Sequence, residues 1–100
     1  MYGLADNEIL QLQRVFAKYK QIEKVLVFGS RSKGTYRTES DLDITMLGTN
    51  LSVSLLDKIV SDIAELNLPY ETDLSIFETI DNPLLQASIL QRNCILYKKD

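Results

Sequence analysis

Apolar residues recur along the chain at two different spacings, which predict helices and strands in alternation. Apolar positions three and four residues apart, the spacing of one helical face, predict helices at 6–20 and 52–66, and the start signal Asn82-Pro83 predicts a further helix to about Gln91. Continuous or alternating apolar residues predict strands at 24–29, 41–47, 70–77 and 94–97. A short helical turn after the first strand completes four helical and four extended segments, and this order predicts a two-layer α/β domain.

A few residues set the expected limits of these elements. Asp6 is a plausible cap for the first helix, and Gly34 is expected to end the short turn in a left-handed conformation. The Leu68-Pro69 pair stops the second long helix. Asn82 is expected to cap the last helix, with Pro83 at its first position.

The first two predicted strands differ in how their apolar residues are arranged. Strand 24–29 contains a continuous apolar run from Val25 to Phe28, so we expect it to be central and covered on both faces. Strand 41–47 alternates, which indicates one buried and one exposed face. Leu42, Ile44 and Met46 share the predicted core face, whereas the predicted exposed face carries Asp41, Asp43 and Thr45.

Length and composition indicate an ordinary globular protein. The chain has 100 residues, of which 45% are hydrophobic and 25% charged, so we expect a single domain over 1–100. No run approaches the roughly 18–20 apolar residues that a membrane span needs, and the first residues do not resemble a secretion signal. Cys94 is the only cysteine, which excludes an internal disulfide. The expected location is therefore the cytoplasm.

Charge and the lack of histidine narrow the possible chemistry. The net charge of −3 argues against a large nucleic-acid interface. The one local basic cluster is Arg31, Lys33 and Arg37, which we interpret as charge for the phosphates of a nucleotide. Without histidine, a Ser-His-Asp arrangement is excluded, and a single cysteine leaves no zinc site of the usual kinds. Any catalysis must therefore depend on carboxylates and metal ions.

The most specific pattern joins a small turn to a pair of acids. Gly29-Ser30 ends the first strand, and Asp41-Leu42-Asp43 opens the second after ten residues. A tight turn at a helix start presents backbone N–H groups to phosphate. Two carboxylates at i and i+2 of a strand share one face, roughly 6.5 Å apart along the chain. Each half alone is common on ordinary surfaces, but together they predict a site for a nucleotide and divalent metal ions.

A third acid is phased to join this pair. If Leu74 and Ile76 face the core, Asp73 points to the same side of the sheet as the first two acids. On a neighbouring strand about 4.8 Å away, the three carboxylates would converge and repel one another, which a bound Mg²⁺ pair relieves. Glu71 and Glu78 are nearby alternatives, and Glu71 shares the face of Asp73 but lies nearer the strand start.

The composite motif resembles that of a known superfamily. Gly29-Ser30, ten residues and then Asp41-Leu42-Asp43 are similar to the signature of polymerase-beta-like nucleotidyltransferases. Arg31, Gly34 and Ser40 resemble the minimal nucleotidyltransferase (MNT) branch, where Ser32-Lys33 replaces a frequent Ala-Arg and keeps the positive charge. The resemblance covers nearly the whole chain, and it implies a mixed β-sheet with helices packed on one face that binds Mg²⁺ and a nucleoside triphosphate.

The resemblance also implies a role for each matching residue. Gly29 would let the backbone approach the phosphates, Ser30 would hydrogen-bond them, and Arg31 and Lys33 would steady the departing pyrophosphate. The residues that it implies as ligands of two Mg²⁺ ions are Asp41, Asp43 and Asp73. The last of these would help to bind the metal ion that activates the attacking hydroxyl, and would accept its proton.

The same resemblance implies a partner. Similar minimal nucleotidyltransferases act beside a helical HEPN toxin in toxin–antitoxin pairs, where the antitoxin transfers AMP from ATP to a tyrosine of the toxin. A cytoplasmic protein adenylyltransferase in a hetero-oligomer with such a toxin is therefore the expected function. Two alternatives remain open: a non-catalytic subunit that neutralises a helical toxin by binding, and a nucleotidyltransferase acting on a small molecule of the aminoglycoside type.

Overall fold

The alternation of helices and strands expected from the sequence is confirmed. The computed structural model describes residues 3–34 and 41–100, apart from the side chain of Lys33. In chain order its elements are α1 (Asp6–Ala17), β1 (Ile22–Phe28), α2 (Ser30–Lys33), β2 (Leu42–Gly48), α3 (Val53–Ala64), β3 (Thr72–Ile76), the 3₁₀ turn η1 (Phe77–Thr79), α4 (Pro83–Gln91) and β4 (Cys94–Lys98). None of the helices in the described ranges is long and apolar enough to cross a membrane.

The four strands form one mixed sheet in the order β3-β2-β1-β4. Strand β1 pairs with both β2 and β4 in antiparallel fashion, whereas β2 and β3 run parallel. The position of β1 between two other strands explains why Val25, Leu26 and Val27 are all buried, although successive side chains of a strand point to opposite faces. The prediction of a central strand covered on both faces is confirmed.

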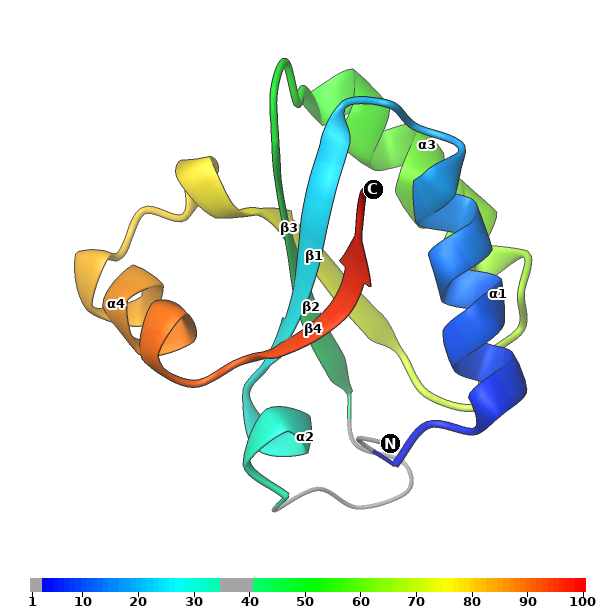
Figure 1. The fold of residues 1–100 in the computed structure, drawn as a ribbon, viewed down its shortest axis with the longest axis horizontal. Coiled ribbons are helices and arrows are strands. Elements are labelled where there is room, and N and C mark those ends of the chain that lie inside the picture. The colour runs from blue at the N-terminus through cyan, green and yellow to red at the C-terminus, as the bar shows by residue number, and fades with distance from the viewer. Residues whose placement is uncertain (1–2, 35–40) are drawn as a thin grey trace.

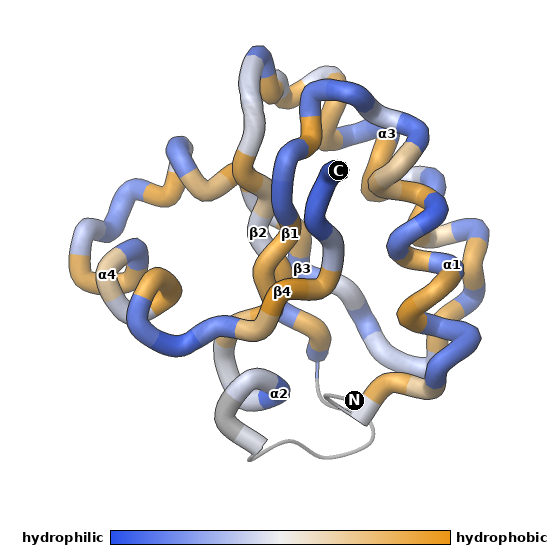
Figure 2. The backbone as a smooth tube through the Cα atoms, in the orientation of Figure 1, coloured by the Kyte–Doolittle hydropathy of each residue, from blue (hydrophilic) through white to orange (hydrophobic). Residues whose placement is uncertain are grey.

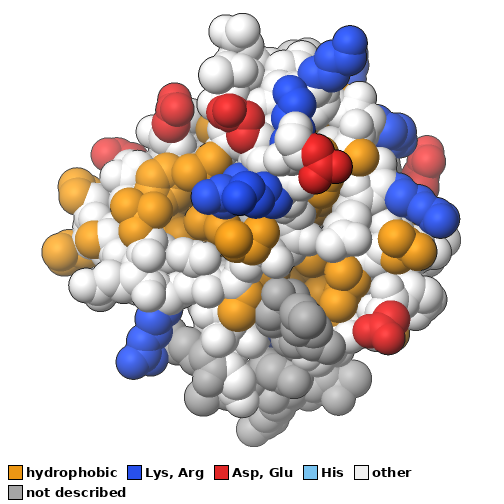
Figure 3. All heavy atoms as spheres, in the orientation of Figure 1, with side chains coloured by type: hydrophobic (Ala, Val, Ile, Leu, Met, Phe, Trp, Pro, Cys, Tyr) orange, Lys and Arg blue, Asp and Glu red, His pale blue; other side chains and the backbone are white. Residues whose placement is uncertain are grey.

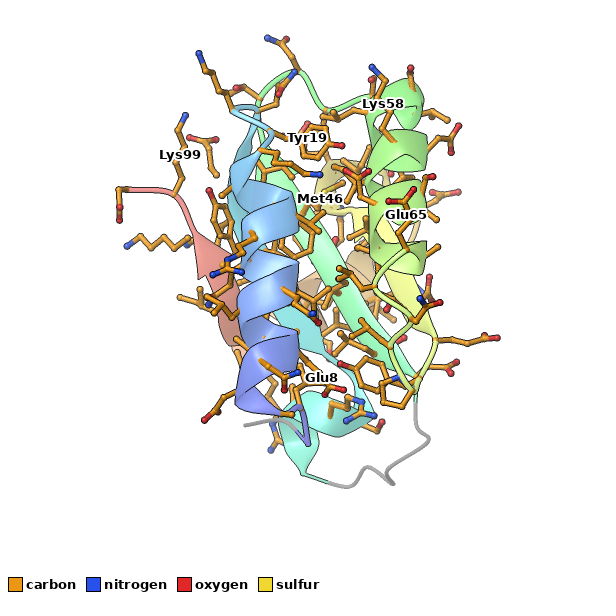
Figure 4. The ribbon with its side chains drawn as sticks, turned by 90° about the vertical axis from the view of Figure 1, so that its right-hand side faces the viewer. Glu8, Tyr19, Met46, Lys58, Glu65 and Lys99 are labelled. Carbon is orange, nitrogen blue, oxygen red and sulfur yellow. The ribbon has the colours of Figure 1, made fainter. Side chains whose placement is uncertain are left out.

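Helices α1 and α3 cover one face of the sheet, and α4 lies on the other side (Figure 1). The arrangement of helices on one face that the resemblance implied therefore describes α1 and α3, but not α4. Figure 4, viewed from the helical side, shows Met46 between α1 and α3. The strand residues that form the main core with these helices are Ile22, Val25, Val27, Leu42, Ile44, Met46, Leu74, Ile76 and Leu96.

The second face of the sheet is covered less completely. Leu26 on this face pairs with Ile95 of β4, and Ile89 of α4 is buried. Helix α4 consists largely of hydrophobic residues (Figure 2), yet Leu84 and Leu90 are 83% and 60% exposed. Hydrophobic side chains consequently gather on the surface in this part of the molecule (Figure 3).

The caps of the helices follow the sequence only in part. Asn82 caps α4 as expected, because its side chain accepts a hydrogen bond from the Leu85 backbone N–H at 3.1 Å. The expectation that Asp6 caps α1 is wrong, since the N-cap is Ala5 and Asp6 is the first helical residue. Glu8 supplies the missing contact: its Oε1 accepts a hydrogen bond from the Ala5 backbone N–H at 2.9 Å.

Candidate active site

The Gly29 turn lies directly against one of the predicted acids. Strand β1 ends at Phe28, α2 begins at Ser30, and Gly29 between them has φ 74° and ψ −151°, a conformation open essentially to glycine alone. A Cβ atom at this position would lie 2.5 Å from Oδ2 of Asp43. The positive φ and the close approach both require glycine here, and they bring the turn and the carboxylate together.

The short helix after this turn ends as the sequence predicts. Gly34 follows α2 in the left-handed conformation, with φ 77° and ψ 8°, and its backbone N–H donates to the carbonyl of Ser30. The chain from Gly29 to Gly34 is therefore one tight helical turn between two glycines. Such a turn leaves its first backbone N–H groups available to an anion.

Asp43 and Asp73 are neighbours across the sheet. They are register partners in the parallel pair of β2 and β3, where adjacent strands lie about 4.8 Å apart. The condition that the two acid-bearing strands be neighbours is thus met. Asp41 lies just before the first residue of β2 and is exposed, rather than inside the strand as predicted.

The acids on either side of Asp43 influence its ionisation. Partial burial raises the pKa of Asp43 above its ordinary value, and the negative charges of Asp73 and Asp41 raise it further. Such repulsion is what a bound divalent cation with a preference for oxygen ligands would relieve, so the donor set suits Mg²⁺. Within residues 3–34 and 41–100, however, no three acidic or cysteine side chains are gathered closely enough to form a ready metal cluster.

A polar pair that sequence reasoning missed lies two residues further along the same strands. Thr45 was expected on the exposed face beside the acids, but it is fully buried. The Ser75 hydroxyl donates to Thr45 Oγ1 at 3.0 Å, and the Thr45 hydroxyl donates to the Ser75 carbonyl at 3.3 Å. These hydrogen bonds join β2 and β3 through side chains as well as through the backbone. The only sign of them in the sequence is that each of the two strands carries a hydroxyl residue two positions after its aspartate.

Of the basic residues predicted to contact phosphate, the structure describes the side chain of Arg31 only. Arg31 is only 2% exposed, and its guanidinium carbon lies 4.6 Å from the centre of the Tyr70 ring. Its side chain therefore packs against the segment before β3. The side chain of Lys33 is outside what the structure describes, as are Arg37 and Ser40.

A surface depression on another part of the molecule is not lined by Asp41, Asp43 or Asp73. It has a volume of about 380 Å³ and lies between α3 and the segment entering β3. Among the described residues that line it, only Glu71 is charged. The alternative acid Glu71 is exposed, and its carbonyl accepts a hydrogen bond from the Leu42 backbone N–H at 2.8 Å. The glycine turn and Asp43 remain the better candidate, because there several groups suited to a nucleotide meet.

Comparison with known proteins defines the class. The family model described as "Polymerase beta, Nucleotidyltransferase" matches residues 10–100, which include the turn and all three acids. The chain therefore belongs to this nucleotidyltransferase family. No curated protein is similar enough in sequence to match it.

Solved structures share the fold at low sequence identity. A chain of a toxin–antitoxin complex with AMP-PNP is 23% identical, with a TM-score of 0.72, and the match covers 97% of this chain and 76% of that one. A chain of the tri-AMPylated Shewanella oneidensis HEPN toxin in complex with MNT antitoxin is 21% identical, with a TM-score of 0.65 over 99% and 74%. A chain of the toxin–antitoxin MntA-HepT is 19% identical, with a TM-score of 0.62 over 93% and 69%.

Proposed function

We propose that this protein transfers AMP from ATP to a tyrosine hydroxyl of a HEPN-type toxin, and so acts as the antitoxin of the pair. The observation that carries the proposal is the meeting of the Gly29 turn with Asp43, whose register partner on β3 is Asp73. Membership of a nucleotidyltransferase family supports the reaction class.

The turn binds the triphosphate in this proposal. Backbone N–H groups at the start of α2 and the Ser30 hydroxyl donate hydrogen bonds to phosphate oxygens. Gly29 lets the phosphates approach because no side chain stands between the backbone and Asp43. Lys33, at the end of α2, supplies positive charge for the departing pyrophosphate.

The carboxylates provide the metal ligands and the base. Asp41, Asp43 and Asp73 would hold two Mg²⁺ ions, which when bound neutralise phosphate charge and favour ionisation of the attacking hydroxyl. The acceptor oxygen forms a bond to the α-phosphorus of ATP, and the bond from that phosphorus to pyrophosphate breaks. Asp73 takes the hydroxyl proton, so the products are the AMP–tyrosine ester and pyrophosphate.

The proposed acceptor rests on the solved structures of similar fold. One contains a HEPN toxin that carries AMP groups and is bound to an MNT antitoxin, and another is a toxin–antitoxin pair with an ATP analogue.

The test is transfer of label from α-³²P-ATP to a HEPN-type protein encoded beside this chain, with Mg²⁺ present. We expect label on a tyrosine of the partner with the wild-type protein, and none with Asp43→Asn. Asp57→Asn is the matched control, because Asp57 is an exposed acid on α3 outside the site. A tight complex without label would contradict the proposal in favour of simple binding, and label only on added small hydroxyl compounds would favour the drug-modifying alternative.

A further inference from the structure

Arg31 is the one charged residue that the structure buries among the side chains it describes. A buried charge is unfavourable unless nearby groups compensate for its lost hydration. The Tyr70 ring is one such group, because its face attracts a guanidinium, and it lies 4.6 Å from the guanidinium carbon. The arginine of the phosphate-binding motif thus directs its charge into the protein.

Tyr70 connects this contact to the first helix. It is only 8% exposed, and its hydroxyl donates a long hydrogen bond of 3.5 Å to Glu8 Oε1. That oxygen also accepts from the Ala5 backbone N–H at the start of α1. Figure 4 shows Glu8 at the end of α1 that lies near α2. One line of contacts therefore runs from α2 through Tyr70 to α1.

The same contacts join the two halves of the candidate site. Arg31 directly follows Ser30, and Tyr70 lies three residues before Asp73. Helix α2 has only four residues, too few to be stable without support from outside. A contact between Arg31 and Tyr70 supplies such support and sets where the phosphate turn lies relative to the strand that carries Asp73.

From this geometry we propose that Arg31 is a positioning residue, which holds the Gly29–Ser30 turn in register with Asp73 by stacking on Tyr70 instead of binding phosphate. The inference rests on the proposed function, because the turn is taken to bind ATP. It predicts that Arg31 and Tyr70 act as one unit. A phosphate ligand would act independently of Tyr70.

The test is a double-mutant cycle with Arg31→Lys and Tyr70→Leu. Lysine keeps the charge but lacks the planar group that stacks on the ring, and leucine removes the ring. We expect each single variant to lower kcat/KM for ATP on the order of tenfold, and the double variant to be little worse than either. Tyr70→Phe keeps the ring and is expected to stay within about threefold of the wild type. Arg14→Lys, at an exposed arginine of α1, is the matched control.

A second readout separates positioning from a general loss of stability. Amide hydrogen exchange at Gly34, whose N–H closes α2 by donating to the Ser30 carbonyl, should accelerate in Arg31→Lys and Tyr70→Leu, while exchange in the centre of β1 stays as slow as in the wild type. Multiplicative losses in the cycle, with unchanged exchange at Gly34, would overturn the inference and make Arg31 a direct ligand. The exchange measurement needs neither ATP nor a partner. Failure of the wild-type protein to bind ATP would therefore count against the proposed function, whereas exchange still decides whether Arg31 holds the turn.

Discussion

The two faces of β2 show how one strand serves stability on one side and chemistry on the other. On the face toward α1 and α3, Leu42, Ile44 and Met46 are completely buried in the main core. On the opposite face, Asp43 is partly buried beside two other acids, and its pKa is raised by burial and by their charge. Burial of the apolar side chains on the packed face stabilises the strand and offsets the repulsion among the carboxylates on the other face. Substitutions on the two faces should therefore have opposite consequences.

The largest effect is expected for Asp43→Asn. Loss of a metal ligand at the reacting phosphate should lower kcat/KM by about 10³-fold or more. Stability should not fall, because the folded-state pKa of Asp43 lies above its unfolded value, so ionisation of this group disfavours folding at neutral pH when no metal is bound. Rates with labelled ATP and melting curves without Mg²⁺ test both parts. A lower melting temperature would show that the carboxylate stabilises the fold instead.

Ile44→Ala tests the packed face of the same strand. The side chain is fully buried, so its truncation should lower the free energy of unfolding by about 2–5 kcal/mol. The rate per folded molecule should change little, because the neighbouring acid keeps its place. Denaturant titration combined with activity below the transition measures both quantities, and a large loss of rate without a loss of stability would break the contrast between the faces.

Gly29→Ala is expected to lower both the stability of the fold and the activity. The added methyl group would stand 2.5 Å from the Asp43 carboxylate, on a backbone with φ 74°. We expect a stability loss of about 1–3 kcal/mol from backbone strain and a loss of activity on the order of 10²-fold. Gly34→Ala is the matched control, because an added Cβ there meets no atom of the described residues within 4 Å although φ is also positive. Equal activity losses in the two variants would mean that the contact with Asp43 is unimportant.

The sequence predicts much of the fold but less of the site. The order of elements and the central β1 follow from local periodicity, and the structure confirms them. Periodicity also placed Asp73 on the face of Asp43, but that the two strands are parallel neighbours is known only from the structure. The contact between Arg31 and the Tyr70 ring was not predictable in this way, because the two residues lie 39 positions apart in the sequence. The burial of Thr45 was also not predictable, because alternation shows which face of a strand a side chain is on but not which other residues cover that face.

A smaller effect is expected at Asp62, on the helix that covers the packed face. The hydrogen bond donated by Tyr19, followed by that from Lys18, lowers the pKa of Asp62. The same Tyr19–Asp62 hydrogen bond, with burial and the Asp62 charge as further causes, raises the pKa of Tyr19 to about 12. A lowered folded-state pKa gives stability that is present above the unfolded value of 3.8 and is lost as pH falls through the folded value. Asp62→Asn should therefore destabilise the protein at neutral pH, and the difference from the wild type should shrink in acid. A difference in melting temperature that is constant with pH would contradict this.

The smallest effect is expected for Leu84→Ser on α4. With 83% of its surface exposed, this side chain should contribute no more than about 0.5 kcal/mol to the stability of the isolated protein. Thermal unfolding of the two proteins at equal concentration measures the difference. Leu12→Ser, at a fully buried position of α1, provides the contrast and should be strongly destabilising. A large effect at Leu84 would show that α4 is covered in solution.

The most direct test of the central claim is calorimetric titration of ATP into the wild-type protein, with Mg²⁺ and with EDTA. The arrangement of Gly29 against Asp43 and its register partner predicts ATP binding that requires Mg²⁺, is retained in Asp57→Asn and is lost in Asp43→Asn. Binding of equal strength in Asp43→Asn, or without magnesium, would contradict the assignment of these carboxylates to a metal–nucleotide site.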